Sequence, residues 1–185
     1  MKKRLLNNLL AGMAAAIVAA SANAANFVSV DVDAVKDTKS KAVSTAQYVR
    51  AGYDTAGLNL GLQVRTAVFE KGGMLNSAEG YLGKTFGPLS VYGGGGYDNA
   101  FNGAPGKAYQ YGLIGATIGA PVGPFYGYTG IKTRINWEKS NPEQTVAFAG
   151  LSYPLTKHVS VNGGFSASRQ DIKENAWGLG MRVTF

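Results

Sequence analysis

Segment 177–185 constrains the fold more than any other part of the chain. Every second side chain in it is large and apolar: Trp177, Leu179, Met181, Val183 and Phe185. The residues between them are Gly, Gly, Arg and Thr. A period of two predicts a β-strand whose two faces meet different surroundings. The sequence therefore predicts a strand with one wholly apolar face that ends on an aromatic residue.

Residues 1–24 have the features of a secretory signal peptide. A basic start at Met1-Lys-Lys-Arg4 precedes an apolar stretch at 9–20, and Ala22-Asn-Ala24 fits the small-x-small cleavage rule. The apolar stretch is shorter than the roughly twenty residues of a transmembrane helix. We expect cleavage after Ala24, which leaves one domain over 25–185; an uncleaved N-terminal anchor is the alternative.

The charge and the cysteine content exclude several classes of function. Without the signal peptide, 15 Lys and Arg stand against 11 Asp and Glu, so no strong basic face for nucleic acid is expected. The absence of cysteine suits an envelope protein that is stable without disulfides. One histidine and no cysteine offer no cluster of metal ligands, and we expect neither a metal nor a cofactor.

Turn signals recur about every 33 residues. Short Gly- and Pro-containing reversals occupy 54–57, 86–88, 121–124 and 154–157. Longer polar breaks lie between them at 36–41, 70–74, 98–107, 136–143 and 169–175. Each period then holds two strands of about ten residues, which is enough to cross the hydrocarbon layer when the strands are tilted. This spacing predicts ten antiparallel strands.

Alternation is clearest in segment 58–65, where Leu58, Leu60, Leu62 and Val64 share one face and Arg65 lies on the other. An open sheet edge in lipid would leave backbone groups unpaired, so the sheet must close. The predicted fold is all-β: a closed antiparallel up-and-down transmembrane β-barrel. We expect its short turns to face the periplasm and its modest loops to face the exterior.

Aromatic residues mark the predicted membrane boundaries. One set lies beside the tight turns or at the C-terminus: Tyr53, Phe86, Phe125, Tyr153 and Phe185. A second set flanks the longer loops: Phe69, Tyr97, Phe101, Trp137 and Trp177. Aromatic rings are enriched at the level of lipid headgroups. These two sets predict a girdle at each end of the barrel.

Together, the signal peptide, the alternating strands, the girdles and terminal Phe185 resemble the small outer-membrane β-barrels of Gram-negative bacteria, of the opacity-protein and OmpA-transmembrane-domain kind. The resemblance implies a location in the bacterial outer membrane, in contact with its lipid and lipopolysaccharide. It also implies that periplasmic chaperones and the outer-membrane assembly machinery recognise the strand that ends at Phe185. These relatives usually have eight strands, which is the alternative to ten. A soluble lipocalin-like barrel, with its apolar residues inward, is the other alternative. The oligomeric state is not predicted.

Charged residues on the inward phase are expected to line the lumen. They are Asp31, Asp33, Arg50, Arg65, Glu79, Lys132, Arg134 and Arg182. Five cations against three carboxylates favour a narrow passive pore with a slight preference for small anions. Charges in a narrow barrel are costly unless they are paired, so a structural barrel plugged by ion pairs is the alternative. A surface-interaction (adhesin-like) barrel that acts through its loops is a further alternative.

One set of residues suggests an enzyme. His158, Ser160 and Glu174 resemble the His/Ser/Glu set of outer-membrane lipid A deacylases. A nucleophile, its base and the orienting group must lie within hydrogen-bond reach. The predicted turns put His158 and Glu174 at opposite ends of the barrel, so we expect no enzymatic activity. An outer-membrane lipid hydrolase is the minor alternative.

Overall fold

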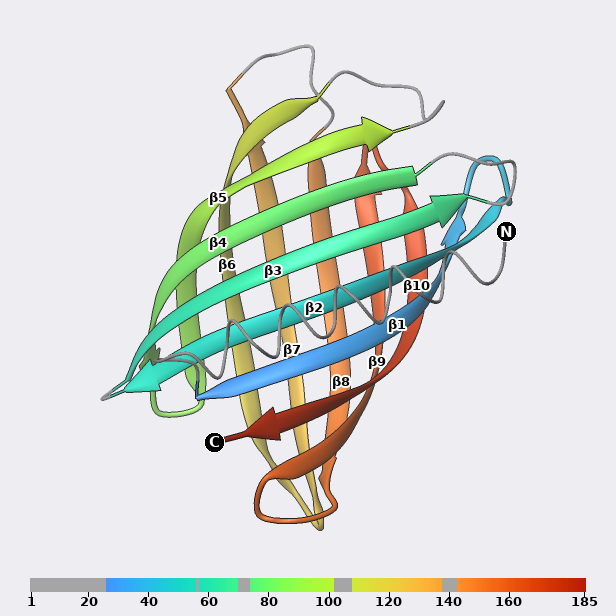
Figure 1. Cartoon of the computed structure of the whole chain (residues 1–185). Helices are drawn as coiled ribbons and strands as arrows, with labels where there is room; N and C mark the ends of the chain where they lie inside the picture. The colour runs from blue at the N-terminus through green and yellow to red at the C-terminus, as the bar shows by residue number, and fades with distance from the viewer. Residues whose placement is uncertain (1–25, 56, 70–73, 102–107, 138–142) are drawn as a thin grey trace.

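The computed structural model describes residues 26–55, 57–69, 74–101, 108–137 and 143–185. The predicted signal peptide, 1–24, lies outside these residues. Ten strands make up the described chain (Figure 1): β1 (Phe27–Asp37), β2 (Val43–Thr55), β3 (Leu58–Phe69), β4 (Met74–Phe86), β5 (Leu89–Phe101), β6 (Tyr109–Val122), β7 (Phe125–Asn136), β8 (Gln144–Pro154), β9 (Val159–Gln170) and β10 (Glu174–Thr184).

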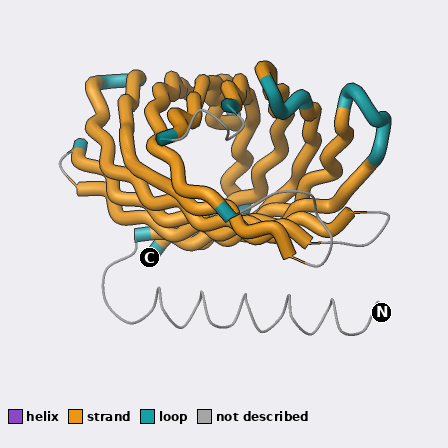
Figure 2. Tube along the Cα trace, turned by 90° about the horizontal axis from the view of Figure 1, so that it is seen from above, coloured by secondary structure: helices purple, strands orange, loops and turns teal. Residues whose placement is uncertain are grey.

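Each strand pairs antiparallel with its neighbours in the chain, and β1 pairs with β10 to close the barrel. Figure 2 shows the ring of strands from above. The prediction of an all-β, closed, up-and-down barrel with ten strands is confirmed. Among the described residues, no helix is long and apolar enough to cross a membrane.

The tight turns form where glycine allows a left-handed backbone. Gly57, Gly87 and Gly123 have φ angles of +78°, +62° and +60°, which residues with a β-carbon adopt only with strain. These turns lie at the same end of the barrel as the start of β1 and the end of β10 (Figure 1). The sequence placed the tight turns correctly.

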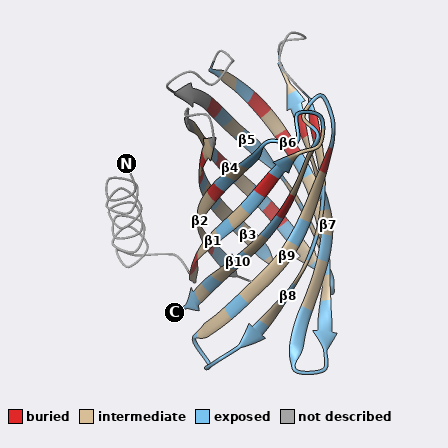
Figure 3. Ribbon diagram, turned by 90° about the vertical axis from the view of Figure 1, so that its right-hand side faces the viewer, coloured by how far each residue is buried: buried red, intermediate tan, exposed pale blue. Residues whose placement is uncertain are grey.

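The barrel is apolar outside and polar inside. Leu62, Ile114 and Leu179 are exposed on the outer face, whereas Glu79 and Arg134 are buried within. Exposed and less exposed residues alternate along the strands, as Figure 3 shows. A soluble barrel would have the opposite arrangement, because water solvates polar side chains and not an apolar belt. The outer face is therefore the lipid-facing surface of a transmembrane barrel, as found in the bacterial outer membrane.

Exposed aromatic residues lie at both ends of the barrel. Beside the tight turns and the C-terminus these are Tyr53, Phe86, Phe125, Tyr153 and Phe185. The rings of Phe125 and Tyr153 are in contact, with centroids 5.3 Å apart. Tyr97, Trp137 and Trp177 are exposed toward the other end. This distribution is that of rings set among lipid headgroups.

The strands extend further into the polar segments than the sequence predicted. The sequence predicts a loop at 98–107, but β5 continues through Asp98 to Phe101. It also predicts a loop at 169–175, but Glu174 begins β10. A strand forms wherever its backbone can hydrogen-bond to a neighbouring strand, whatever the polarity of its side chains. An inward charge is tolerated there because another strand supplies its counter-ion.

Removing Phe185 is expected to reduce the amount of assembled barrel in the outer membrane strongly. The backbone N–H of Phe185 donates to the carbonyl of Asn26 at 2.9 Å, directly beyond the β1–β10 seam that closes the barrel. Outer-membrane fractions would be compared by immunoblot, with the heat-dependent gel shift as the measure of folding. Phe185→Tyr is the control and should assemble normally. Normal levels of the truncated protein would contradict the assembly role.

Candidate functional site

The interior of the barrel holds a cavity of about 750 Å³. Residues from all ten strands line it, because each strand turns every second side chain inward. The eight charged residues predicted for the lumen all line this cavity: Asp31, Asp33, Arg50, Arg65, Glu79, Lys132, Arg134 and Arg182. These eight residues lie on the inward face of their strands.

The two walls of the lumen differ in bulk. The inward residues of β9 are all small or short: Ser160, Asn162, Gly164, Ser166 and Ser168. Most of the long charged side chains and all of the lining tyrosines come from β2 to β7, while Glu174 and Arg182 come from β10, beside β9. In a closed barrel of ten strands, β9 lies opposite β4. The wall of the cavity is therefore least bulky at the inward residues of β9 themselves.

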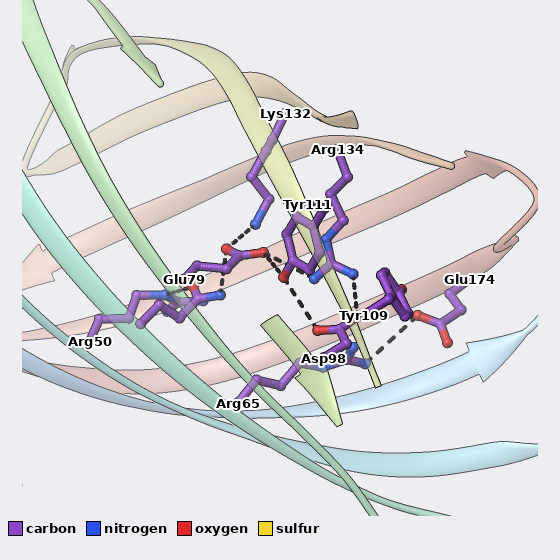
Figure 4. Close-up of polar contacts among 10 residues, drawn as sticks. Arg50, Arg65, Glu79, Asp98, Tyr109, Tyr111, Lys132, Arg134 and Glu174 are labelled. Atoms are coloured by element: carbon purple, nitrogen blue, oxygen red, sulfur yellow. Dashed lines mark hydrogen bonds and ion pairs between the residues drawn. The ribbon is translucent and has the colours of Figure 1, made fainter. Parts of the chain in front are cut away.

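A buried ion cluster connects β4, β5 and β7 (Figure 4). The Glu79 carboxylate accepts from Lys132 at 2.6 Å and from Arg134 at 3.0 Å. Arg134 also donates to Asp98 at 2.9 Å. The side chains of Glu79, Asp98 and Arg134 are only 3–6% exposed. Each charge has lost its water, so the pairing within the cluster must offset that desolvation.

Two tyrosines of β6 complete the cluster. The Tyr111 hydroxyl donates to Glu79 at 3.0 Å and to Asp98 at 3.3 Å, and the Tyr109 hydroxyl donates to Asp98 at 2.9 Å. The Arg134 guanidinium lies 4.4 Å from the centre of the Tyr111 ring, a cation–π contact. Four neighbouring strands, β4 to β7, are thus joined by one polar network.

The other inward charges lie on β1, β2, β3 and β10. Arg50 pairs with Asp31, and its Nε donates to the Gln63 side chain at 2.7 Å. Arg65 is 3.8 Å from Glu174. Among the described residues, Arg182 has no carboxylate partner within ion-pair distance and lies 3.6 Å from the centre of the Phe27 ring.

The balance of charge inside the barrel corrects the sequence-based count. Asp98 and Glu174 face inward, so the described interior holds five cations and five carboxylates, and Asp54 adds a carboxylate at the rim near the tight turns. The sequence contained the signal, since Asp98 is in phase with inward Gly96 and Glu174 with inward Arg182. The inward phase of Asp98 and Glu174 is hard to recognise in the sequence, because the polar residues beside them resemble a loop.

Inward glycines are covered by aromatic rings from neighbouring strands. The outer ring atoms of Tyr81 occupy the position that a β-carbon of Gly61 would take, and the two residues are direct cross-strand partners. The same arrangement joins further partner pairs: Phe27 with Gly52, Tyr92 with Gly115, Tyr111 with Gly96, Tyr128 with Gly150, and Phe148 with Gly130. Glycine in a strand marks such close approach. The rings consequently lie along the wall and leave the centre of the lumen free.

The residues that suggested a hydrolase are not brought together. His158 lies beside a tight turn, and its Nδ1 is 3.0 Å from the carbonyl oxygen of Thr184. Glu174 begins β10 while Thr184 ends it, a separation of about 33 Å for ten strand residues. Glu174 instead faces Arg65. Within the described ranges, no group of three His, Cys, Asp or Glu side chains is placed to hold a metal ion.

Comparison with known proteins identifies the fold. No family profile and no curated protein matches the chain by sequence. The KdgM porin, solved with disordered oligogalacturonate, aligns at a TM-score of 0.51 and 8% identity over 86% of this chain and 99% of that one. Neisserial surface protein A aligns at 0.48 and 15% identity over 86% and 96% of the two chains, and Escherichia coli outer membrane phospholipase A at 0.42 and 12% over 86% and 92%. The chain thus has the fold of outer-membrane β-barrels, and its lipid-facing exterior suits that membrane.

Replacing Arg134 by alanine is expected to lower the free energy of unfolding by about 3 kcal/mol, because Glu79 and Asp98 would each lose a buried partner. Urea titration of the folded barrel in lipid vesicles, followed by tryptophan fluorescence, measures this. Lys84→Ala is the matched control, since Lys84 is exposed on the outer face. Equal stability of the two variants would contradict a compensating role for Arg134.

Replacing Gly61 by valine is expected to cost about 2 kcal/mol of stability, because the Tyr81 ring must leave the wall to make room. Gly80→Val is the control: Gly80 is adjacent to Tyr81, but a β-carbon there meets nothing within 4 Å. The same urea titration compares the two. An equal effect at both positions would mean that the rings do not depend on the glycines.

Proposed function

We propose that the protein is a narrow passive pore of the outer membrane. The main support for this proposal is the cavity of about 750 Å³, which residues of all ten strands line and whose β9 wall carries only small inward residues. Eight strands give an interior that side chains just fill, whereas sixteen leave an aqueous channel. Ten strands alone would favour a filled lumen. The inward glycines and serines, with rings held against the wall, favour an open one.

The proposed selectivity is weak. A slight preference for small anions was predicted from an excess of inward cations, and Asp98 and Glu174 remove that excess. Arg182 is the remaining basis for the preference, because no carboxylate within the described residues pairs with it. Asp33 has no ion pair there either, and it opposes the effect of Arg182. We therefore expect similar permeabilities for small anions and cations.

A plugged structural barrel is the second candidate. Four of the five inward cations are held in ion pairs, which is what a salt-bridged plug requires. The pairs of Glu79 join β4 and β7, however, and within the described residues the inward side chains of β9 take part in no ion pair. In either case we propose a non-enzymatic protein whose partners are outer-membrane lipid and lipopolysaccharide, with chaperones and the assembly machinery during biogenesis.

Single-channel recording with an introduced cysteine tests the pore. The chain has no cysteine, so Ser166→Cys creates a unique thiol on the β9 wall. A charged, water-soluble methanethiosulfonate reagent is expected to lower its conductance in steps, because the added group occupies the open side of the lumen. Ala167→Cys is the matched control on the lipid-facing side of the same strand and should not respond.

Three outcomes are informative. Discrete channels that are blocked only in Ser166→Cys support a pore along β9. Channels that respond equally in both variants place the conducting path elsewhere. Silence from protein that shows the heat-dependent gel shift of a folded barrel contradicts the pore and favours the plugged alternative.

A further inference from the structure

The part of the cavity nearer the tight turns contains polar groups that the ion cluster does not use. Arg182, Tyr81 and Tyr128 line it from three different strands. Within the described part of the chain, the hydroxyls of Tyr81 and Tyr128 and the guanidinium of Arg182 have no hydrogen-bond partner. None of these polar atoms is fully buried. They are thus available to a molecule in the lumen.

The same region presents aromatic surface. Tyr81 and Tyr92 are in contact, with ring centroids 5.4 Å apart and planes tilted by 48°. Both rings, and that of Tyr128, lie across glycines of neighbouring strands, so they line the wall and do not block the lumen. Tyrosine in this setting offers an apolar ring together with a polar hydroxyl. The C–H face of a saturated, hydroxylated ring packs well against such surfaces.

Donors and acceptors are mixed in this region. Arg50 and Arg182 supply donors, Asp31 supplies an acceptor, and Asp33 supplies another further toward the loops. A hydroxyl group both donates and accepts, so it can use either kind of group, and its hydrogen bonds to charged partners are the stronger ones. A free anion would meet the two carboxylates, and also Asp54 at the rim. A free cation would meet the two guanidiniums. The combination suits an uncharged hydroxylated molecule better than an ion.

The geometry points to a binding site for an uncharged monosaccharide in the half of the lumen nearer the tight turns. The sugar ring would lie against Tyr81 and Tyr128, with its hydroxyls on Arg182, Asp31 and the tyrosine hydroxyls. The cavity of which this region is one part measures about 750 Å³, within the range of small-molecule sites. The inference deepens the proposed pore by naming a class of solute, and it rests on that pore only for the route by which the solute crosses.

D-Glucose binding to the folded barrel in detergent micelles tests the site, measured by saturation-transfer NMR titration. Arg182→Gln is expected to raise the Kd about tenfold, since hydrogen bonds to a charged group are lost. Tyr81→Phe keeps the ring and is expected to raise it about threefold. Tyr153→Phe is the matched control, because Tyr153 is exposed on the outer face at the same end of the barrel; its Kd should not change.

D-Glucuronate, which has the same ring with a carboxylate, is expected to bind more weakly than glucose. The inference is overturned if glucose does not bind, if all three variants bind it like the parent, or if glucuronate binds as tightly. Each variant is first shown to be folded by its heat-dependent gel shift. Binding without conductance contradicts the pore alone, whereas conductance without glucose binding contradicts the sugar site alone.

Discussion

The structure depends on one constraint: in lipid, every backbone N–H and C=O must find a partner within the protein. Ten antiparallel strands meet it only when β1 pairs with β10, because that pairing removes both free edges. Closure then fixes which side chains face lipid and which face the interior. The apolar phase of each strand covers the outside, and polar side chains are confined to the interior of the barrel.

Confinement determines how the charges are arranged. An unpaired charge in such a space is costly, and Glu79, Asp98, Lys132 and Arg134 avoid that cost by pairing across β4, β5 and β7. The network also gathers these charges on one wall. The opposite strand, β9, carries only small inward residues, and the cavity of about 750 Å³ is lined by both walls. Charge compensation and an open lumen are therefore compatible, because the paired side chains leave this volume between the walls.

The inward glycines give the aromatic side chains room beside the wall of the barrel. A ring such as that of Tyr81 needs room, and Gly61 on the adjacent strand supplies it along the wall. With any larger residue at that position the ring would have to project toward the centre. The lumen of this ten-stranded barrel thus stays partly free, because the aromatic rings lie against the glycines of adjacent strands. This arrangement makes aromatic faces and hydroxyls available to a solute.

The sequence by itself determined the strand number, the positions of the tight turns and the inward phase of the charged residues. These properties follow from local chemistry: the period of two in 58–65 and 177–185, and the need for glycine at Gly57 and Gly87. Only the tertiary structure decided that Asp98 and Glu174 belong to strands and cancel the excess of positive charge. It also decided which rings cover which glycines. Both depend on register between strands, since a residue's neighbour across the barrel lies far away in the chain and pairing alone brings the two together.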